Sequence, residues 1–168
     1  MEASQRIEPP FHGNEKDTLI GFLDFLRQTV VLKCRGLTEE QMRATPTVSS
    51  ISLLGMVKHL TIVERYWFRA VFLDADVDLP WSEEDPDGDW RHDDEDSGAI
   101  AIADYLAECA KSNEIVASHD LDSLAKWAKS DEERVNLRYI VVHLIEETGR
   151  HCGHADIIRE AIDGVTGE

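Results

Sequence analysis

The stretch that decides the fold lies in the last third of the chain, from residue 136 to residue 164, and reads NLRYIVVHLIEETGRHCGHADIIREAIDG. Its apolar residues recur at intervals of three and four, which is the spacing of an amphipathic helix. Asn136 is a favourable N-cap and Gly164 a favourable C-terminal stop. We therefore predict one long helix between these two residues, with its apolar face in a hydrophobic core.

Four polar residues of this stretch share one side of the predicted helix. They are His143, Glu147, His151 and His154, and their stripe overlaps the apolar face. A buried carboxylate is costly unless it is paired or binds a metal, and the helical wheel places no Lys or Arg beside Glu147. Side chains four residues apart have Cβ atoms about 5 to 6 Å apart, so Glu147 and His151 can reach the same ion.

A third candidate ligand lies in a second predicted helix, which begins after the Ser-rich turn at residues 49–52 and runs to about Leu73. His59 is the only histidine of this helix and falls on its apolar face. Two imidazoles and one carboxylate leave the fourth position of a tetrahedral ion open, as in catalytic rather than structural zinc sites. We therefore predict that His59, Glu147 and His151 bind one divalent metal ion.

Two interpretations without a metal stay open. His59 alone would fit a hydrogen-bonded core histidine, and Glu147 could pair with His143 one turn earlier. A dinuclear carboxylate site is not expected, because it needs two Glu-x-x-His motifs and the chain has none. Cys152 points about 100° away from His151 around the helix, so we do not expect it as a ligand. The remaining histidines are expected in exposed loops: His12, His92 and His119.

Two further predicted helices complete the pattern. One begins after Asn14 and ends near Gly36, and the other spans about 99–118 with Ser97 as its cap. We expect the latter helix to turn the following residues inward: Ile100, Ala103, Leu106, Ala110 and Ile115. No alternating β pattern appears, so the sequence predicts an all-α four-helix bundle.

The stretch from residue 74 to residue 97 joins the second and third helices and has no helical period. It contains twelve acidic residues, two prolines and a glycine, a composition that favours a loop. Trp81 and Trp90 are unusual in a purely solvated segment. We expect the loop to fold back on the bundle and Trp81 or Trp90 to cover the mouth of the metal site.

Composition excludes several classes of protein. The 168 residues fit a single domain over residues 1–168, and 34 acidic against 17 basic residues give a net charge of -17. Such a surface repels phosphate and no basic run offsets it, so we do not expect nucleic-acid binding. No apolar stretch approaches the roughly 20 residues that cross a bilayer, and the N-terminal residues lack a secretory signal. Three cysteines leave one unpaired in any disulfide scheme, which favours the cytoplasm and buried free thiols.

Two motifs resemble the DinB superfamily: SLLGMVKHLTIVERYWF at residues 52–68 and IEETGRHCGHAD at residues 145–156. The resemblance covers nearly the whole chain, including Leu-Pro-Trp and Asp-Pro-Asp in the acidic loop, and points to an actinobacterial DinB-like branch. It implies a four-helix bundle of up-down-down-up order, in which the acidic stretch crosses over between helices two and three.

The resemblance also implies a metal and a cosubstrate. Many DinB-like proteins bind zinc, nickel or a similar ion through one His of helix two and His-x-x-x-His of helix four. Glu147 stands at the first position of that pair here, as in the branch of the mycothiol-dependent maleylpyruvate isomerase, which uses two His and one Glu. The resemblance thus implies the same set of His59, Glu147 and His151. It implies zinc first, with nickel or iron as alternatives, and mycothiol as the low-molecular-weight thiol.

The function expected from these features is that of a metal-dependent thiol S-transferase, whose partners are the small thiol and a small electrophile. A thiol at the open metal position would lose its proton and become a nucleophile at neutral pH. His143 and His154 are candidates for orienting a ligand or carrying protons. The alternatives are a non-catalytic metal-binding or stress-response bundle, and a helical interaction protein without metal. A homodimer is compatible with each of them.

Overall fold

The protein is built from helices, as its periodicity predicts. The computed structural model describes residues 6–167, and this part contains four long helical rods and three short helical pieces. The rods are α1 (Glu15–Cys34), α3 (Leu53–Glu64) continued by η1 (Arg65–Phe72), α4 (Gly98–Ser118) and α5 (Leu137–Asp163). The short pieces are α2 (Glu39–Arg43), η2 (Gly88–Trp90) and η3 (Asp131–Glu133). The prediction of an all-α four-helix bundle is confirmed.

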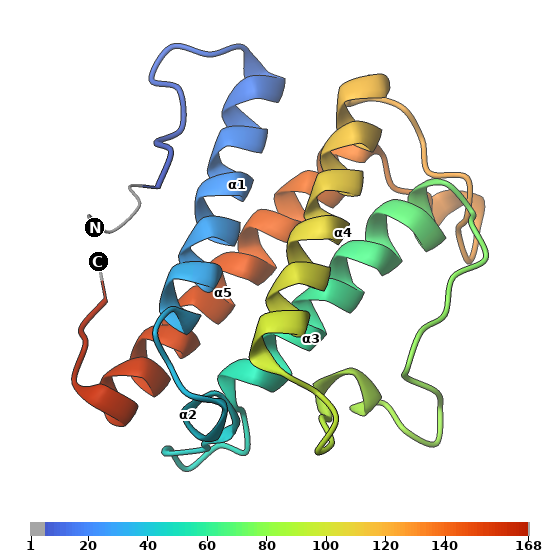
Figure 1. Cartoon of the computed structure of the whole chain (residues 1–168). Helices are drawn as coiled ribbons and strands as arrows, with labels where there is room; N and C mark the ends of the chain where they lie inside the picture. Colours follow the sequence, from blue (N-terminus) through green and yellow to red (C-terminus); the bar gives the residue numbers. More distant parts are fainter. Residues whose placement is uncertain (1–5, 168) are drawn as a thin grey trace.

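The rods follow the up-down-down-up order that the resemblance implies (Figure 1). α3 and α4 run in the same direction, while α1 and α5 run in the opposite one. α1 packs mainly against α5, and α3 packs mainly against α4 and also contacts α5. Because α3 and α4 are parallel, the chain between them must return along the length of the bundle, which explains the long acidic crossover at residues 74–97.

Side-chain caps fix where the rods begin. The residue just before each rod accepts a hydrogen bond from the backbone N–H three residues on: Asn14, Ser52, Ser97 and Asn136. α5 ends at Gly164, which has a left-handed φ of 79°. The predicted starts of the rods therefore agree with the structure within one residue, and the predicted ends agree within two.

Two local features were not predicted. The second rod stays helical as far as Phe72, but its last eight residues form the π-helix η1, whose i→i+5 bonding changes which side chains share a face. The connection after α1 contains the short helix α2, which begins with a capping box of Thr38 and Gln41. That Thr-x-x-Gln pattern is the sequence signal that could have revealed α2.

The buried face of α4 differs from the prediction. Ile100 is 60% exposed and Leu106 is 47% exposed, and of the five residues expected inward only Ile115 is buried. The helix instead buries small and polar side chains: Ala101, Tyr105, Glu108, Cys109, Ser112 and Val116. Hydrophobic periodicity failed here because the inward face is partly polar, and the displaced apolar residues lie on the surface.

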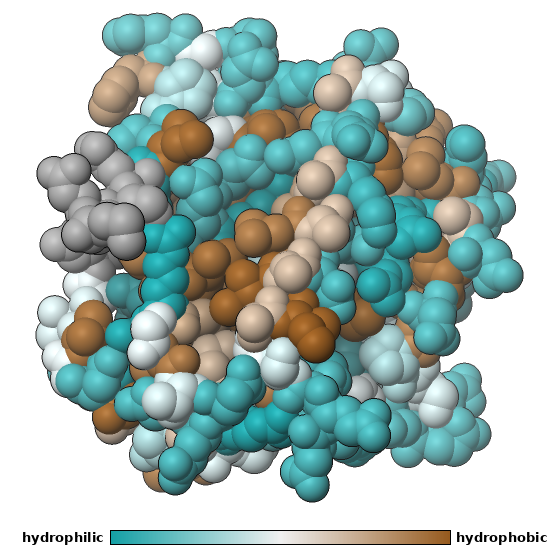
Figure 2. All heavy atoms as spheres, in the orientation of Figure 1, coloured by the Kyte–Doolittle hydropathy of each residue, from teal (hydrophilic) through white to brown (hydrophobic). Residues whose placement is uncertain are grey.

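Figure 2 shows apolar surface along the front face, over α4 and its border with α1. Phe22 of α1, which is also half-exposed, adds to the apolar surface of the molecule. No helix in the described range 6–167 is long and apolar enough to cross a membrane.

The acidic crossover folds back on the bundle, as expected. η2 lies against α3, and the backbone approach is so close that a Cβ on Gly55 would sit 2.6 Å from the carbonyl oxygen of Trp90. Lys58 forms an ion pair with Asp96 at 2.6 Å, which ties the end of the crossover to the same helix. The end of the crossover is therefore docked on α3.

Candidate metal centre

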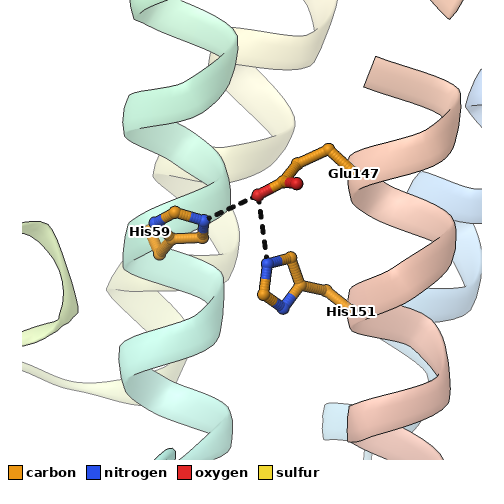
Figure 3. A group of neighbouring side chains, drawn as sticks. All are labelled: His59, Glu147 and His151. Atoms are coloured by element: carbon orange, nitrogen blue, oxygen red, sulfur yellow. Dashed lines mark hydrogen bonds and ion pairs between the residues drawn. The ribbon is translucent and has the colours of Figure 1, made fainter. Parts of the chain in front are cut away.

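The three predicted ligands lie together in the structure (Figure 3). His59 comes from α3, whereas Glu147 and His151 come from successive turns of α5. Oε1 of Glu147 lies 3.2 Å from Nε2 of His59 and 3.2 Å from Nε2 of His151. One candidate donor atom of each residue lies within 4.8 Å of the other two. Both imidazoles therefore turn the same ring nitrogen toward the carboxylate.

The electrostatics of this cluster suit a cation. Burial opposes the charged form of Glu147, but the interactions of its carboxylate with His59 and His151 outweigh burial, so the pKa of Glu147 is lowered. Burial and the neighbouring His59 lower the pKa of His151 against the opposing pull of Glu147. An ionised carboxylate and a neutral imidazole are the forms that bind divalent metals.

The crossover supplies two further side chains: Asp89, which the sequence did not assign to this place, and Trp90, which was a candidate to cover the site. Oδ2 of Asp89 lies 2.6 Å from Nδ1 of His59, and the Asp89 side chain is 3% exposed. The Trp90 ring stacks on the His59 imidazole, with centroids 4.0 Å apart and planes 16° apart. The tryptophan in an acidic loop was the available signal, but Asp89 is one of twelve acidic residues there and nothing in the sequence distinguishes it.

A family model for mycothiol-S-transferases matches residues 18–164. The chain belongs to the mycothiol-S-transferase family. This confirms the resemblance to DinB-like proteins related to mycothiol transferases, and the matched range includes all three candidate ligands. A comparison with curated proteins finds no match.

The donor set of this mycothiol-S-transferase family member fits a divalent ion. Two imidazole nitrogens and a carboxylate oxygen are typical zinc ligands, and nickel or iron accepts the same set. The donors come from two helices and converge without rearrangement of the rods. The assignment of His59, Glu147 and His151 as ligands stays a prediction.

The two auxiliary histidines proposed from the sequence have different surroundings. Nδ1 of His154 lies 3.3 Å from Nδ1 of His151, so His154 can orient that ring. His143 contacts Trp67 of η1, with ring centroids 4.6 Å apart. Oε1 of Glu147 contacts Nε2 of His59 and Nε2 of His151, so the alternative of a His143–Glu147 pair is not the arrangement observed.

Of the two tryptophans that were candidates to cover the mouth of the site, Trp90 is the one that lies beside the candidate ligands. Trp90 covers His59 and approaches His151, with centroids 5.3 Å apart. Trp81 packs instead on Tyr66, away from the ligands. Trp90 therefore covers one side of the candidate site.

The expectation of exposed loop histidines is right for His12 and wrong for the other two. His92 is partly buried and hydrogen-bonds to Ser52 through Nε2, at 3.1 Å. His119 is partly buried against Phe72, in an edge-on contact. Both loops pack on the bundle, which periodicity in the helices could not reveal.

The cysteines are free and buried, as expected. Burial raises the pKa of Cys34 and of Cys152 to about 12, and burial with the nearby Glu64 carboxylate raises the pKa of Cys109 further. Cys152 Sγ contacts the backbone oxygen of Leu26 at 3.4 Å, on the α1 side of the helix. None of these thiols offers a thiolate at neutral pH.

Proposed function

We propose that this protein is a metal-dependent S-transferase that joins the sulfur of a low-molecular-weight thiol, mycothiol, to a small electrophile. The ion is held by His59, Glu147 and His151, with zinc as the first candidate. The observation that carries the proposal is the convergence of these three donors from α3 and α5 within a chain of the mycothiol-S-transferase family.

The thiol must come from solution in this proposal. The three cysteines of the chain are buried, and their raised pKa values keep them protonated at neutral pH. The candidate site, in contrast, is partly open, since His59 and Glu147 are only partly buried. A small molecule can therefore reach the ligands while the protein's own sulfur atoms cannot react.

The proposed reaction breaks the S–H bond and forms a C–S bond. The thiol proton passes to water, the sulfur electron pair attacks the electrophilic carbon, and the leaving group departs with the electrons of the bond that breaks. A divalent ion bound at the site lowers the pKa of a thiol in its open position. Trp90 shields one side of the cluster from water by stacking on His59.

The auxiliary histidines have separate parts in this scheme. His154 holds the ring of His151 through the contact between their Nδ1 atoms, so that Nε2 of His151 faces Glu147. His143 lies one turn before Glu147 on α5 and packs beside Trp67 and Tyr139. We assign this aromatic surface to the apolar part of the electrophile.

The test measures metal content and thiol transfer on the same preparations. Elemental analysis should find about one equivalent of metal in the parent protein and little in His59→Ala or Glu147→Ala. Consumption of mycothiol with a chromogenic alkylating agent should follow metal content. Glu146→Ala is the matched control, because Glu146 is the exposed neighbour and pairs with Arg150 instead.

Two results would contradict the proposal differently. A parent protein that binds no metal, even with added zinc or nickel, excludes the site itself. A parent that binds one ion but transfers no thiol to a panel of electrophiles favours the non-catalytic metal-binding or stress-response alternative.

A further inference from the structure

The acidic crossover reaches the candidate metal centre through one buried carboxylate, that of Asp89. Its Oδ2 is 2.6 Å from Nδ1 of His59, on the side of the ring opposite the nitrogen that faces Glu147. A carboxylate with 3% exposure is stable only if it is hydrogen-bonded or paired, and His59 provides that partner. This contact therefore belongs to the folded core rather than to a fluctuating surface.

The contact has a defined chemical consequence for His59. Two carboxylates face this ring, and neither can donate a hydrogen bond when ionised. The single hydrogen of the neutral imidazole therefore belongs on the nitrogen with the closer carboxylate, which is Nδ1 at 2.6 Å from Asp89 rather than Nε2 at 3.2 Å from Glu147. The lone pair is then on Nε2, the atom that lies 3.2 Å from Oε1 of Glu147. His59 therefore turns a nitrogen with a free lone pair, able to bind a metal, toward Glu147 only in the tautomer that Asp89 favours.

The geometry of the crossover fixes Asp89 at this position. The next residue, Trp90, stacks on the same imidazole, and its carbonyl oxygen lies against Gly55, four residues before His59 on α3. Gly88, the preceding residue, lies so close to the Pro80 carbonyl that it too has no space for a side chain. Asp89 is therefore held between two close backbone contacts.

We propose that Asp89 is a positioning residue that sets the tautomer and ring orientation of His59, and that metal affinity thereby depends on the docking of the crossover segment Gly88–Trp90 on α3. The inference rests on the proposed metal site and deepens it. Partners of this kind, hydrogen-bonded to a metal-binding histidine, change metal affinity by about 10- to 100-fold when removed.

The first test measures zinc affinity by competition with a chromophoric chelator. Asp89→Ala should bind zinc about 10- to 100-fold more weakly than the parent. Asp89→Asn keeps an acceptor oxygen of the same shape and should recover much of that loss. Asp87→Ala is the matched control, because Asp87 lies directly before this segment, is exposed, and makes no side-chain capping hydrogen bond to η2.

The second test needs no metal and guards against a variant that merely unfolds the crossover. In the metal-free parent at pH 8, ¹⁵N spectroscopy of the His59 ring should show the hydrogen on Nδ1. In Asp89→Ala it should move to Nε2, next to Glu147, while Asp89→Asn should keep it on Nδ1.

The outcomes separate this inference from the proposed function. Equal zinc affinity of the parent and Asp89→Ala, or a hydrogen on Nε2 in the parent, overturns the role of Asp89 even if thiol transfer is observed. If Asp87→Ala binds zinc as weakly as Asp89→Ala, the effect comes from a general loosening of the crossover, and the role of Asp89 is overturned as well. A loss of zinc affinity of tenfold or more that occurs in Asp89→Ala and not in Asp87→Ala supports the role of Asp89, whether or not the parent transfers thiols.

Discussion

At the scale of single residues, the most unusual pair in the bundle is Arg27 on α1 and Glu64 at the end of α3. Their side chains are 3% and 1% exposed, and two hydrogen bonds of 2.7 and 2.6 Å join them. Burial opposes the charge on Arg27, but the Glu64 carboxylate outweighs it, so the pKa of Arg27 is raised. Asp24 and Asn113 accept from the remaining guanidinium nitrogen. The pair thus joins α1, α3 and α4 through one network.

Removing one partner of this pair should destabilise the protein more than replacing both partners with apolar residues. Glu64→Ala leaves Arg27 charged and buried, and we expect it to lower the free energy of unfolding by about 3 to 5 kcal/mol. The double variant Arg27→Met with Glu64→Leu should recover most of this loss, because it removes both charges and fills similar volume. Urea unfolding of the three proteins checks the order. A double variant as unstable as Glu64→Ala would show that the cost comes from packing alone.

The residues of the site differ in how far the sequence reveals them. Glu147 and His151 are predictable because a spacing of four fixes their neighbourhood on any helix. His59 could be placed on an inward face, but its distance to them depends on the packing of α3 on α5. Asp89 lies in a stretch without periodicity, so only the folded crossover identifies it. The same limit explains why the Arg27–Glu64 pair, 37 positions apart, was not anticipated.

At the scale of elements, the close contact of the crossover with α3 depends on a glycine. A Cβ at Gly55 would lie 2.6 Å from the Trp90 carbonyl oxygen, which is backbone and cannot rotate away. Gly153 in α5 is the opposite case, since nothing lies within 4 Å of a Cβ built there. Glycine inside a helix is less favourable than alanine by about 0.5 to 1 kcal/mol. Substitution of Gly153 therefore tests helix preference alone, whereas substitution of Gly55 also tests the contact with the crossover.

We predict opposite signs for the two glycine-to-alanine substitutions. Gly153→Ala should raise the free energy of unfolding of the metal-free protein by about 0.5 to 1 kcal/mol. Gly55→Ala should lower it, because displacement of η2 outweighs the gain in helix preference, and should also weaken zinc binding by moving Asp89 from His59. Chemical unfolding and chelator competition measure both effects. A stabilised Gly55→Ala variant with parental zinc affinity would contradict a docked crossover.

The contact between α4 and the π-helix η1 explains why the wrong face of α4 was predicted. Glu108 is buried on α4 and receives hydrogen bonds from Arg69 of η1 and from Lys111, at 3.2 Å each. A second arginine of η1, Arg65, lies 3.5 Å from the same carboxylate. A charged residue at an inward position breaks the apolar period, and its arginine partners belong to a different rod. The pattern of α4 alone therefore favoured the face with Ile100 and Leu106.

Glu108 makes part of the stability dependent on pH. Burial opposes its ionisation, but the hydrogen bonds from Arg69 and Lys111 outweigh it, so its pKa in the folded protein lies below the ordinary value of 4.5. Its contribution is therefore present above about pH 4.5 and is lost as pH falls through the lower folded pKa. At pH 6 we expect Glu108→Gln to be less stable than the parent by about 1.5 to 3 kcal/mol.

The check is a series of urea unfolding curves between pH 6 and pH 3. The difference between the parent and Glu108→Gln should shrink as pH falls, because the parent loses the ionised carboxylate. Glu114→Gln, an exposed substitution on the same helix, serves as the control and should follow the parent throughout. A gap that stays constant down to pH 3 would mean that the charge of Glu108 is not what stabilises the contact.

At the scale of the whole molecule, bundle order could be predicted but its surface could not. The parallel pair α3 and α4 requires a long connection, and the acidic stretch at residues 74–97 provides it. The periodicity had placed Ile100 and Leu106 inside, so their exposure on α4 is known only from the folded structure, and Figure 2 shows apolar surface over this helix. A homodimer remains a prediction, and sedimentation of the parent protein would measure it.

The site also joins parts of the chain that are far apart, and this gives a last prediction about the whole bundle. His59 and Glu147 are 88 positions apart, so an ion that binds both recognises the folded chain and not the unfolded one. Zinc at 100 times its dissociation constant should therefore raise the free energy of unfolding by about 2.7 kcal/mol. The increase should vanish in Glu147→Ala and persist in Glu146→Ala, as measured by urea unfolding with zinc or with a chelator. If zinc stabilised Glu147→Ala equally well, the ion would have to bind elsewhere, with the acidic crossover as the alternative, and the two-helix site would be excluded.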